Sequence, residues 1–201
     1  MRWCLHSRHE LRATDLDPHN TARPLNGANA LTALRALLVP VSAWAIANQL
    51  WTVAAGAFVI AVVSDLLDGP LARRSGTVSA FGGLFDHGTD AAFVVASTAA
   101  AVWLGLLPIG LPVLIALAFA QYVIDSGANR GRALRASWLG RCNGIAYFVL
   151  LGFIVLQPAL GITLLSESIL YWVGWGLLLS TAASMLDRLL AAPSHDVSQD
   201  D

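Results

Sequence analysis

Residues 64–90 read SDLLDGPLARRSGTVSAFGGLFDHGTD, and this stretch contains two pairs of aspartates. Asp65 and Asp68 are three residues apart, and Asp86 and Asp90 are four residues apart. On an α-helix, residues at either spacing lie on the same face. The first pair follows an apolar segment and the second pair precedes another. We therefore expect two antiparallel helices, joined within this stretch, that bring the four carboxylates together.

The rest of the chain has the apolar composition of an integral membrane protein. Of its 201 residues, 56% are hydrophobic and 12% are charged, whereas a soluble domain carries about 25% charged residues. Six apolar segments can be marked at about residues 31–47, 51–67, 91–107, 111–124, 144–156 and 169–186. We expect each to extend into flanking polar residues, because a membrane-spanning helix needs about 20 residues. The pattern predicts an all-α, polytopic membrane protein of six transmembrane helices.

The arginines predict the orientation of these helices. All twelve basic residues are arginine, and they lie before or within the first segment, between the second and third, between the fourth and fifth, and after the sixth. The other three connections contain none. Because basic loops remain cytoplasmic, both termini and the acidic stretch are predicted to face the cytoplasm, across the inner (cytoplasmic) membrane. An outer aromatic belt is expected from Trp51, Trp103, Tyr171, Trp172 and Trp175.

Three parts are expected along the chain. Residues 1–28 form a polar cytoplasmic segment, residues 29–190 the membrane domain, and residues 191–201 a disordered tail. The first segment has no apolar core after its first charges, so it is not expected to be a cleaved signal peptide. The two cysteines, Cys4 and Cys142, lack the spacing of a metal motif and are expected to be free thiols. The net charge of -1 gives no basic field that would attract nucleic acid.

Four neighbouring carboxylates repel one another unless cations lie between them. Oxygen ligands of this kind suit Mg²⁺, Mn²⁺ or Ca²⁺, and two such ions are suited to phosphoryl displacement. Arg73 lies between the two pairs and offers the forked donor that binds phosphate well. The alternative is that the aspartates only cap helix ends, but four acids beside two membrane segments favour a function.

These residues resemble a known signature. The order Asp65-x-x-Asp68-Gly69-x-x-Ala72-Arg73, then eight residues, then Gly82-x-x-x-Asp86-x-x-x-Asp90, is similar to that of the CDP-alcohol phosphotransferases at every specified position. A weaker similarity is the run Asn29-x-Leu31-Thr32-x-x-Arg35, with Pro40 opening the first span. Six spans after a cytoplasmic N-terminal segment also resemble the fold of this family.

The resemblance implies a reaction and its residues. Two Mg²⁺ or Mn²⁺ ions would be held by Asp65, Asp68, Asp86 and Asp90. The CDP moiety would be bound by Asp65, Asp68, Gly69, Ala72, Arg73 and Gly82. Asp90 would also act as the general base toward the hydroxyl of the acceptor, which attacks the phosphorus bearing the lipid while CMP leaves. The implied partners are a CDP-linked lipid donor, a small polar alcohol, the bilayer and, in a homodimer, a second copy.

The acceptor alcohol is less clear than the donor. A cluster of arginines follows the fourth segment, namely Arg130, Arg132, Arg135 and Arg141. These residues suit a phosphorylated acceptor such as glycerol phosphate or inositol phosphate, and they equally suit anchoring to lipid headgroups. Family members that use glycerol phosphate often have a Gly-Lys pair and a threonine where Gly140-Arg141-Cys142-Asn143 stands. The residues around His87 depart from those members as well.

Two other classes of function share parts of this pattern. A catalytically inactive relative that serves as a membrane scaffold would retain the fold without the chemistry. A divalent-cation transporter would place acids near the middle of the membrane or at both faces, whereas these acids cluster at one face beside an arginine. The sequence favours the enzyme over both.

Overall fold

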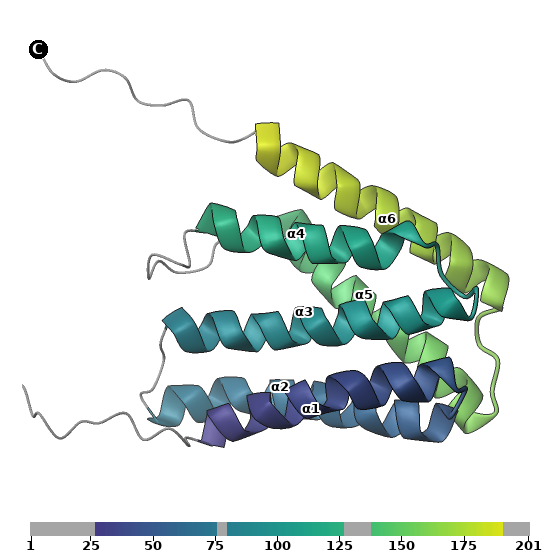
Figure 1. Cartoon of the computed structure of the whole chain (residues 1–201), viewed down its shortest axis with the longest axis horizontal. Helices are drawn as coiled ribbons and strands as arrows, with labels where there is room; N and C mark the ends of the chain where they lie inside the picture. Colours follow the sequence, from purple (N-terminus) through teal and green to yellow (C-terminus); the bar gives the residue numbers. More distant parts are fainter. Residues whose placement is uncertain (1–26, 76–79, 127–137, 191–201) are drawn as a thin grey trace, which may run out of the picture.

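In the part of the chain that the computed structural model describes, six α-helices form a bundle (Figure 1). The structure describes residues 27–75, 80–126 and 138–190, and their side chains except those of 27–30, 68–75, 80–84 and 125–126. The helices are α1 (Gly27–Ala47), α2 (Trp51–Ser75), α3 (Ala80–Trp103), α4 (Gly110–Ser126), α5 (Trp138–Leu160) and α6 (Glu167–Leu190). The predicted segments 1–26 and 191–201 lie outside the described residues.

Successive helices run in opposite directions. Helix α1 begins, α2 ends, α3 begins and α6 ends at one end of the bundle, which we call the aspartate end (Figure 1). The described connections between α1 and α2, α3 and α4, and α5 and α6 lie at the other end. This alternation brings the two aspartate-bearing helix ends to the same side of the molecule, as their spacing in the sequence predicted.

The six predicted helices are present, and each is longer than the apolar segment that indicated it. Helix α3 begins at Ala80, well before the apolar run, so Asp86 and Asp90 lie within the helix. Pro40 lies inside α1 instead of opening it. Pro158 is a turn signal in the sequence, but α5 continues through it to Leu160 and the turn follows at Gly161. The Gln157 Oε1 atom accepts hydrogen bonds from the backbone N–H groups of Leu164 and Leu165, at 2.7 and 2.6 Å.

Small side chains allow α1, α2 and α3 to pack closely. Ala45, Ala54 and Ala101 are completely buried, and α1 packs against both α2 and α3. Ser42 on α1 and Ser97 on α3 form a buried hydrogen bond of 2.9 Å between their hydroxyl groups. Helix α4 links α3 to α6, and α5 lies against α2 and α6. The three-helix unit therefore carries the acids, and the other three helices enclose the space beside it.

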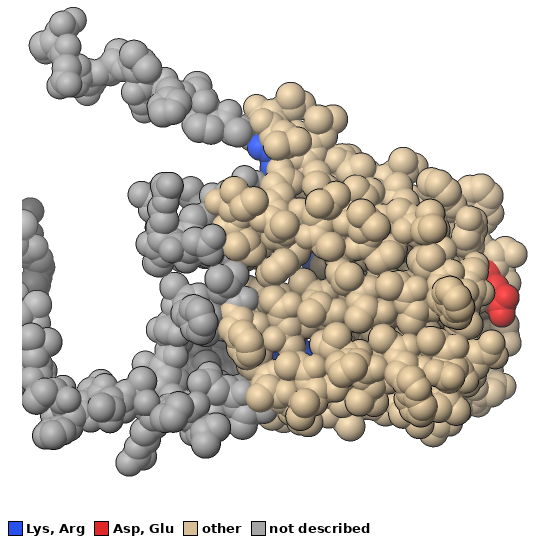
Figure 2. Space-filling view, in the orientation of Figure 1, with Lys and Arg blue, Asp and Glu red and all other residues tan. Residues whose placement is uncertain are grey.

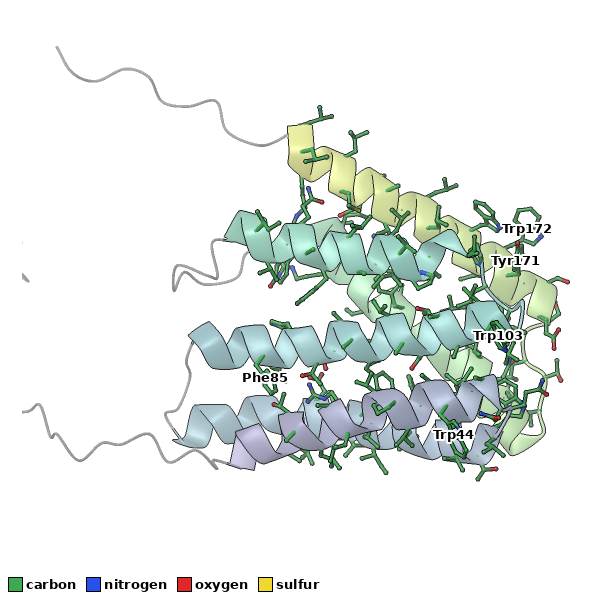
Figure 3. All side chains as sticks on the ribbon, viewed as in Figure 1. Trp44, Phe85, Trp103, Tyr171 and Trp172 are labelled. Atoms are coloured by element: carbon green, nitrogen blue, oxygen red, sulfur yellow. The ribbon has the colours of Figure 1, made fainter. Side chains whose placement is uncertain are left out.

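The outer surface of the bundle is apolar. Leu37, Trp103, Ile145 and Leu179 belong to four different helices and are 64–82% exposed. The face in Figure 2 is almost entirely uncharged, and its few basic atoms lie towards the aspartate end. Figure 3 shows Trp103, Tyr171 and Trp172 at the opposite end, where the aromatic belt was expected. Soluble proteins rarely expose apolar surface on this scale.

Two helices satisfy the length and hydropathy expected of a membrane span on their own. These are α5 and α6, and most of the apolar window of each is unburied in the bundle. Shorter apolar helices run from Leu31 to Ala47, from Trp51 to Leu67 and from Gly110 to Ile124. The described residues therefore support a helical protein in contact with lipid.

Candidate active site

Three of the four predicted aspartates converge on one arginine. Asp65 belongs to α2, and Asp86 and Asp90 lie one turn apart on α3. Arg35 on α1 donates hydrogen bonds from Nη1 to Oδ1 of Asp86 at 2.8 Å and to Oδ1 of Asp90 at 2.6 Å. The same Nη1 lies 3.5 Å from Oδ1 of Asp65. One nitrogen atom therefore joins three helices.

Arg35 was not predicted as a site residue. Its side chain is only 1% exposed, although it carries a charge. Thr32, one turn earlier on α1, supports it, because its hydroxyl is 3.5 Å from Oδ1 of Asp86. The sequence did contain a signal, since Arg35 lies inside the first apolar segment, and an ionisable residue within a membrane segment usually has a function.

The charge balance around Arg35 favours additional cations. Among the described side chains of the cluster, one guanidinium faces three carboxylates. Asp86, His87 and Asp90 each offer a ligand atom, and these atoms lie within 4.8 Å of one another. Carboxylate oxygens are the preferred ligands of Mg²⁺ and similar hard cations. The donor set therefore fits a divalent metal ion.

A cavity of about 420 Å³ opens beside the acids. Asp65 and Asp90 lie at its wall together with two basic residues, Arg141 and Arg188. A second group of lining residues is polar, namely Asn143, Tyr147, Thr181 and Ser184. The remaining wall is largely apolar and includes Val94, Ile115, Phe119, Phe148 and Met185. The cavity therefore offers separate places for an anionic group, for hydroxyl groups and for hydrocarbon.

The two arginines come from helix ends that meet at the aspartate end. Arg141 lies in the first turn of α5, and Arg188 lies in the last turn of α6. The guanidinium carbon of Arg188 is 5.3 Å from the centre of the Tyr122 ring, so a cation–π contact positions it. The sequence predicts Arg141 as a possible acceptor residue, whereas Arg188 indicates only the topology there.

The remaining predicted residues cannot be placed in the cavity. Arg130, Arg132 and Arg135 lie outside the described residues. Asp68, Gly69, Ala72 and Arg73 belong to the last turns of α2, and Gly82 to the first turn of α3, but their side chains lie outside the described ones. The backbone does place Asp68 one turn after Asp65 on α2.

Comparison with known proteins identifies the class to which this site belongs. Residues 25–182 match the sequence model of the CDP-alcohol phosphatidyltransferases. The match covers most of the chain and includes Arg35, the aspartates, all of α5, and α6 as far as residue 182, so that Arg188 lies beyond it. The chain therefore belongs to the CDP-alcohol phosphatidyltransferase family. It is a membrane-bound transferase of phospholipid biosynthesis, and this family uses divalent metals.

Individual relatives point to two related activities. The chain is 32% identical over 142 residues to a probable phosphatidylglycerophosphate synthase of Mycobacterium tuberculosis, covering 67% of this chain and 68% of the relative. It is 25% identical over 179 residues to the CMP-forming cardiolipin synthase of Streptomyces coelicolor, covering 83% and 82%. A chloroplastic CDP-diacylglycerol–glycerol-3-phosphate 3-phosphatidyltransferase of rice is 31% identical over 132 residues, 66% of this chain and 40% of that protein.

Proposed function

We propose that this enzyme transfers a phosphatidyl group from CDP-diacylglycerol to an alcohol that already carries a phosphate, in the first place glycerol phosphate. The observation that carries the proposal is the cavity, in which Asp65 and Asp90 share a wall with Arg141 and Arg188. An anion and a hydroxyl of one small molecule can therefore be held at the same time. Two relatives, named a probable phosphatidylglycerophosphate synthase and a CDP-diacylglycerol–glycerol-3-phosphate 3-phosphatidyltransferase, agree with this acceptor.

Asp90 is proposed as the group that removes the proton from the acceptor hydroxyl. It lines the cavity, and its Oδ1 is held by Arg35 at 2.6 Å, which fixes the carboxylate in one direction. The acceptor oxygen then forms a bond to the phosphorus that carries diacylglycerol, the bond from that phosphorus to CMP breaks, and CMP leaves. Because the carboxylate is already oriented, little conformational entropy is lost when it meets the acceptor hydroxyl.

The donor is proposed to lie across the ends of α2 and α3. Asp65, Asp68, Asp86 and Asp90 would hold two Mg²⁺ or Mn²⁺ ions, and these would offset the charge that develops on the phosphate oxygens. Gly69, Ala72, Arg73 and Gly82 would contact the CDP moiety together with the first two aspartates. Arg73 would pair with the diphosphate, because its planar fork matches two phosphate oxygens.

The acceptor phosphate is proposed to bind between Arg141 and Arg188. Arg141 stands where glycerol phosphate enzymes often carry lysine, so the positive charge is retained while the geometry becomes bidentate. Arg130, Arg132 and Arg135 would add to the positive field from the preceding connection. We place the aspartate end at the cytoplasmic face of the inner membrane, since every arginine of the sequence falls before or within α1, near the aspartate ends of α2, α5 and α6, or between α4 and α5. We also expect a homodimer.

A second acceptor, the lipid phosphatidylglycerol, is favoured by a specific observation. Part of the cavity wall consists of apolar side chains such as Ile115, Phe119 and Phe148, which a water-soluble acceptor does not need. The relative from Streptomyces coelicolor is named a cardiolipin synthase. Phosphatidylglycerol also carries a phosphate next to its glycerol hydroxyls, so the same two arginines would serve it.

An acceptor panel tests the proposal. Purified protein in detergent with Mg²⁺ and CDP-diacylglycerol is given glycerol phosphate, inositol phosphate, phosphatidylglycerol, inositol or serine, and CMP release is measured. We expect release with glycerol phosphate or phosphatidylglycerol, and a loss of about 10²- to 10⁴-fold in Asp90→Asn, because general base catalysis contributes that much. The exposed Trp103→Phe, at the far end, is the matched control.

Two results would contradict the proposal. Release with inositol or serine alone would show that no phosphate on the acceptor is needed. An Asp90→Asn variant that remains folded and fully active would remove the proposed role of that residue.

A further inference from the structure

Asn143 contains a buried hydrogen-bond donor that the reaction described above does not use. It lies in the second turn of α5 and lines the cavity, yet it is only 5% exposed. Its Oδ1 accepts a hydrogen bond of 2.8 Å from the hydroxyl of Ser180 on α6. Its Nδ2 has no hydrogen-bond partner among the residues that the structure describes.

An unpaired buried donor is unusual and unfavourable. Most buried polar atoms in proteins have a partner, and leaving one without a partner costs more than a typical hydrogen bond contributes. The bond from Ser180 fixes one edge of the carboxamide, so the free Nδ2 has a set direction. An exception that lines a cavity is best explained by a ligand that completes the bond.

The neighbouring hydroxyl groups do not supply this partner. Tyr147, one turn further along α5, pairs with Thr181 on α6 through their hydroxyls. Thr181 is also bound to the backbone oxygen of Leu177. Both hydroxyl groups are therefore bonded to other partners and neither is bonded to Nδ2 of Asn143, so among the described residues the partner of this donor would have to come from a molecule in the cavity.

The position of Asn143 defines which part of a ligand it would meet. Arg141 lies two residues earlier and is exposed at the aspartate end, whereas Asn143 is buried further along α5. In the proposed complex, Arg141 holds the phosphate of the acceptor and the reacting hydroxyl lies beside Asp90. The remaining polar groups of the acceptor would then face the buried part of the cavity wall, where Asn143 lies. A hydroxyl can accept a hydrogen bond from an amide N–H, and a methylene cannot.

We propose that Asn143 is a specificity-determining residue whose Nδ2 donates a hydrogen bond to a hydroxyl of the acceptor that does not react. The enzyme therefore selects a phosphorylated polyol, in which a second hydroxyl neighbours the attacking one. This inference rests on the proposed function and deepens it. Glycerol phosphate and the headgroup of phosphatidylglycerol both have a second hydroxyl next to the attacking one, so this inference is compatible with either acceptor.

The test compares glycerol phosphate with 3-hydroxypropyl phosphate, which has the same chain without the middle hydroxyl. For the wild-type protein we expect kcat/KM to be about 10- to 100-fold higher with glycerol phosphate, because the analogue leaves a buried donor unpaired. In Asn143→Leu, which keeps the size but not the donor, we expect this ratio to fall to about 1. If phosphatidylglycerol proves to be the acceptor, the same comparison uses it and its analogue without the middle hydroxyl of the headgroup.

Two further variants separate recognition from folding. Gln121→Leu removes another carboxamide, whose Nε2 is bonded to the backbone oxygen of Met185 at 3.1 Å and which does not line the cavity. It should leave the substrate ratio unchanged. Ser180→Ala keeps Asn143 but allows its carboxamide to rotate, so it should lower the substrate ratio partially. This variant still tests the inference if Asn143→Leu fails to fold.

The outcomes distinguish this inference from the function on which it rests. Equal losses with both substrates in Asn143→Leu, or no preference in the wild-type protein, would overturn the role of Asn143 and leave the proposed function standing. A wild-type protein that uses no phosphate-bearing acceptor would contradict the proposed function itself.

Discussion

A single guanidinium organises the acid cluster. Nη1 of Arg35 contacts Asp65, Asp86 and Asp90, which come from two helices, while Arg35 belongs to a third. A buried cation of this kind is stable only while its partners remain, and the acids in turn repel one another without it. Arg35 is therefore expected to hold the acids in place before substrate binds.

Replacing Arg35 tests this interdependence. We expect Arg35→Met to lower the free energy of unfolding by about 3 kcal/mol, since it leaves partly buried carboxylates uncompensated. Added Mg²⁺ should raise the melting temperature of this variant more than that of the wild-type protein, because the ions take over part of the compensation. The measurement is thermal unfolding in detergent with and without Mg²⁺, and Arg35→Lys is the charge-preserving control. Equal Mg²⁺ responses in Arg35→Met and wild type would show that Arg35 does not balance the acids.

Arg141 allows a separate test of the acceptor phosphate. Loss of a charge-assisted hydrogen bond costs about 1.5–3 kcal/mol, so Arg141→Ala should raise KM for glycerol phosphate by roughly 10- to 100-fold. The effect on kcat should be small, since the phosphate is held equally before and during the reaction. Arg141→Lys should recover part of the affinity, because it keeps the charge without the fork. If KM is unchanged and kcat falls, Arg141 acts on the chemical step instead.

At the scale of single residues, the sequence predicted the acids better than their partner. The spacing of Asp86 and Asp90 requires a shared helix face, and their meeting with Asp65 follows from two antiparallel helices. The contact with Arg35 depends on how α1 lies against α3, and no spacing in the sequence encodes that arrangement. Arg188 and Asn143 were missed for the same reason, since only the packing of α6 on α5 brings them to one cavity.

Helix α6 approaches the connection between α3 and α4 through a glycine. A Cβ atom on Gly174 would lie 2.8 Å from Cδ of Pro108 and 2.9 Å from Cδ2 of Leu107, both inside contact distance. Gly176, two residues further on the same helix, has no such neighbour within 4 Å. Alanine substitutions at these two positions therefore distinguish the effect of close packing from the general effect of removing a glycine from a helix.

We expect Gly174→Ala to lower stability by about 1–3 kcal/mol, the usual cost of overpacking. Gly176→Ala should be neutral or stabilising by up to about 1 kcal/mol, because alanine favours the helix. Thermal unfolding of both variants in the same detergent gives the comparison. Two variants with the same stability would mean that α6 can shift away from Pro108 at little cost.

The helices themselves were predictable because each needs a long apolar run, but their ends were not. Helix α3 extends back to Ala80 through polar residues, since a helix at the membrane surface can continue into water. Helix α5 continues through Pro158 in its last turn and stops at Gly161, whose φ of 66° favours glycine. Proline near a helix end reads as a turn in the sequence, and only the tertiary contacts of Gln157 with the following loop show otherwise.

On the scale of the whole molecule, basic and aromatic side chains gather at opposite ends. The arginines whose side chains the structure describes, Arg35, Arg141 and Arg188, belong to the half at the aspartate end, and the opposite end carries the aromatic residues Trp103, Tyr171 and Trp172 (Figure 3). Between the ends, apolar side chains cover the surface. If the aspartate end lies at the cytoplasmic face of a bilayer, the arginines lie on the cytoplasmic side and the aromatic residues lie at the outer interface, as expected for a membrane protein.

Labelling of single cysteines tests this orientation. In a background with Cys4→Ser and Cys142→Ala, Thr163→Cys places a thiol in the exposed connection between α5 and α6, and Trp138→Cys places one at the exposed start of α5. A membrane-impermeant maleimide should label the first variant in intact cells and the second only after the inner membrane is made permeable. The reverse pattern would put the acids and the cavity on the outside, where CDP-linked donors and CMP are not available. Labelling of both sites in intact cells would require that the six helices do not cross the membrane as a single alternating bundle.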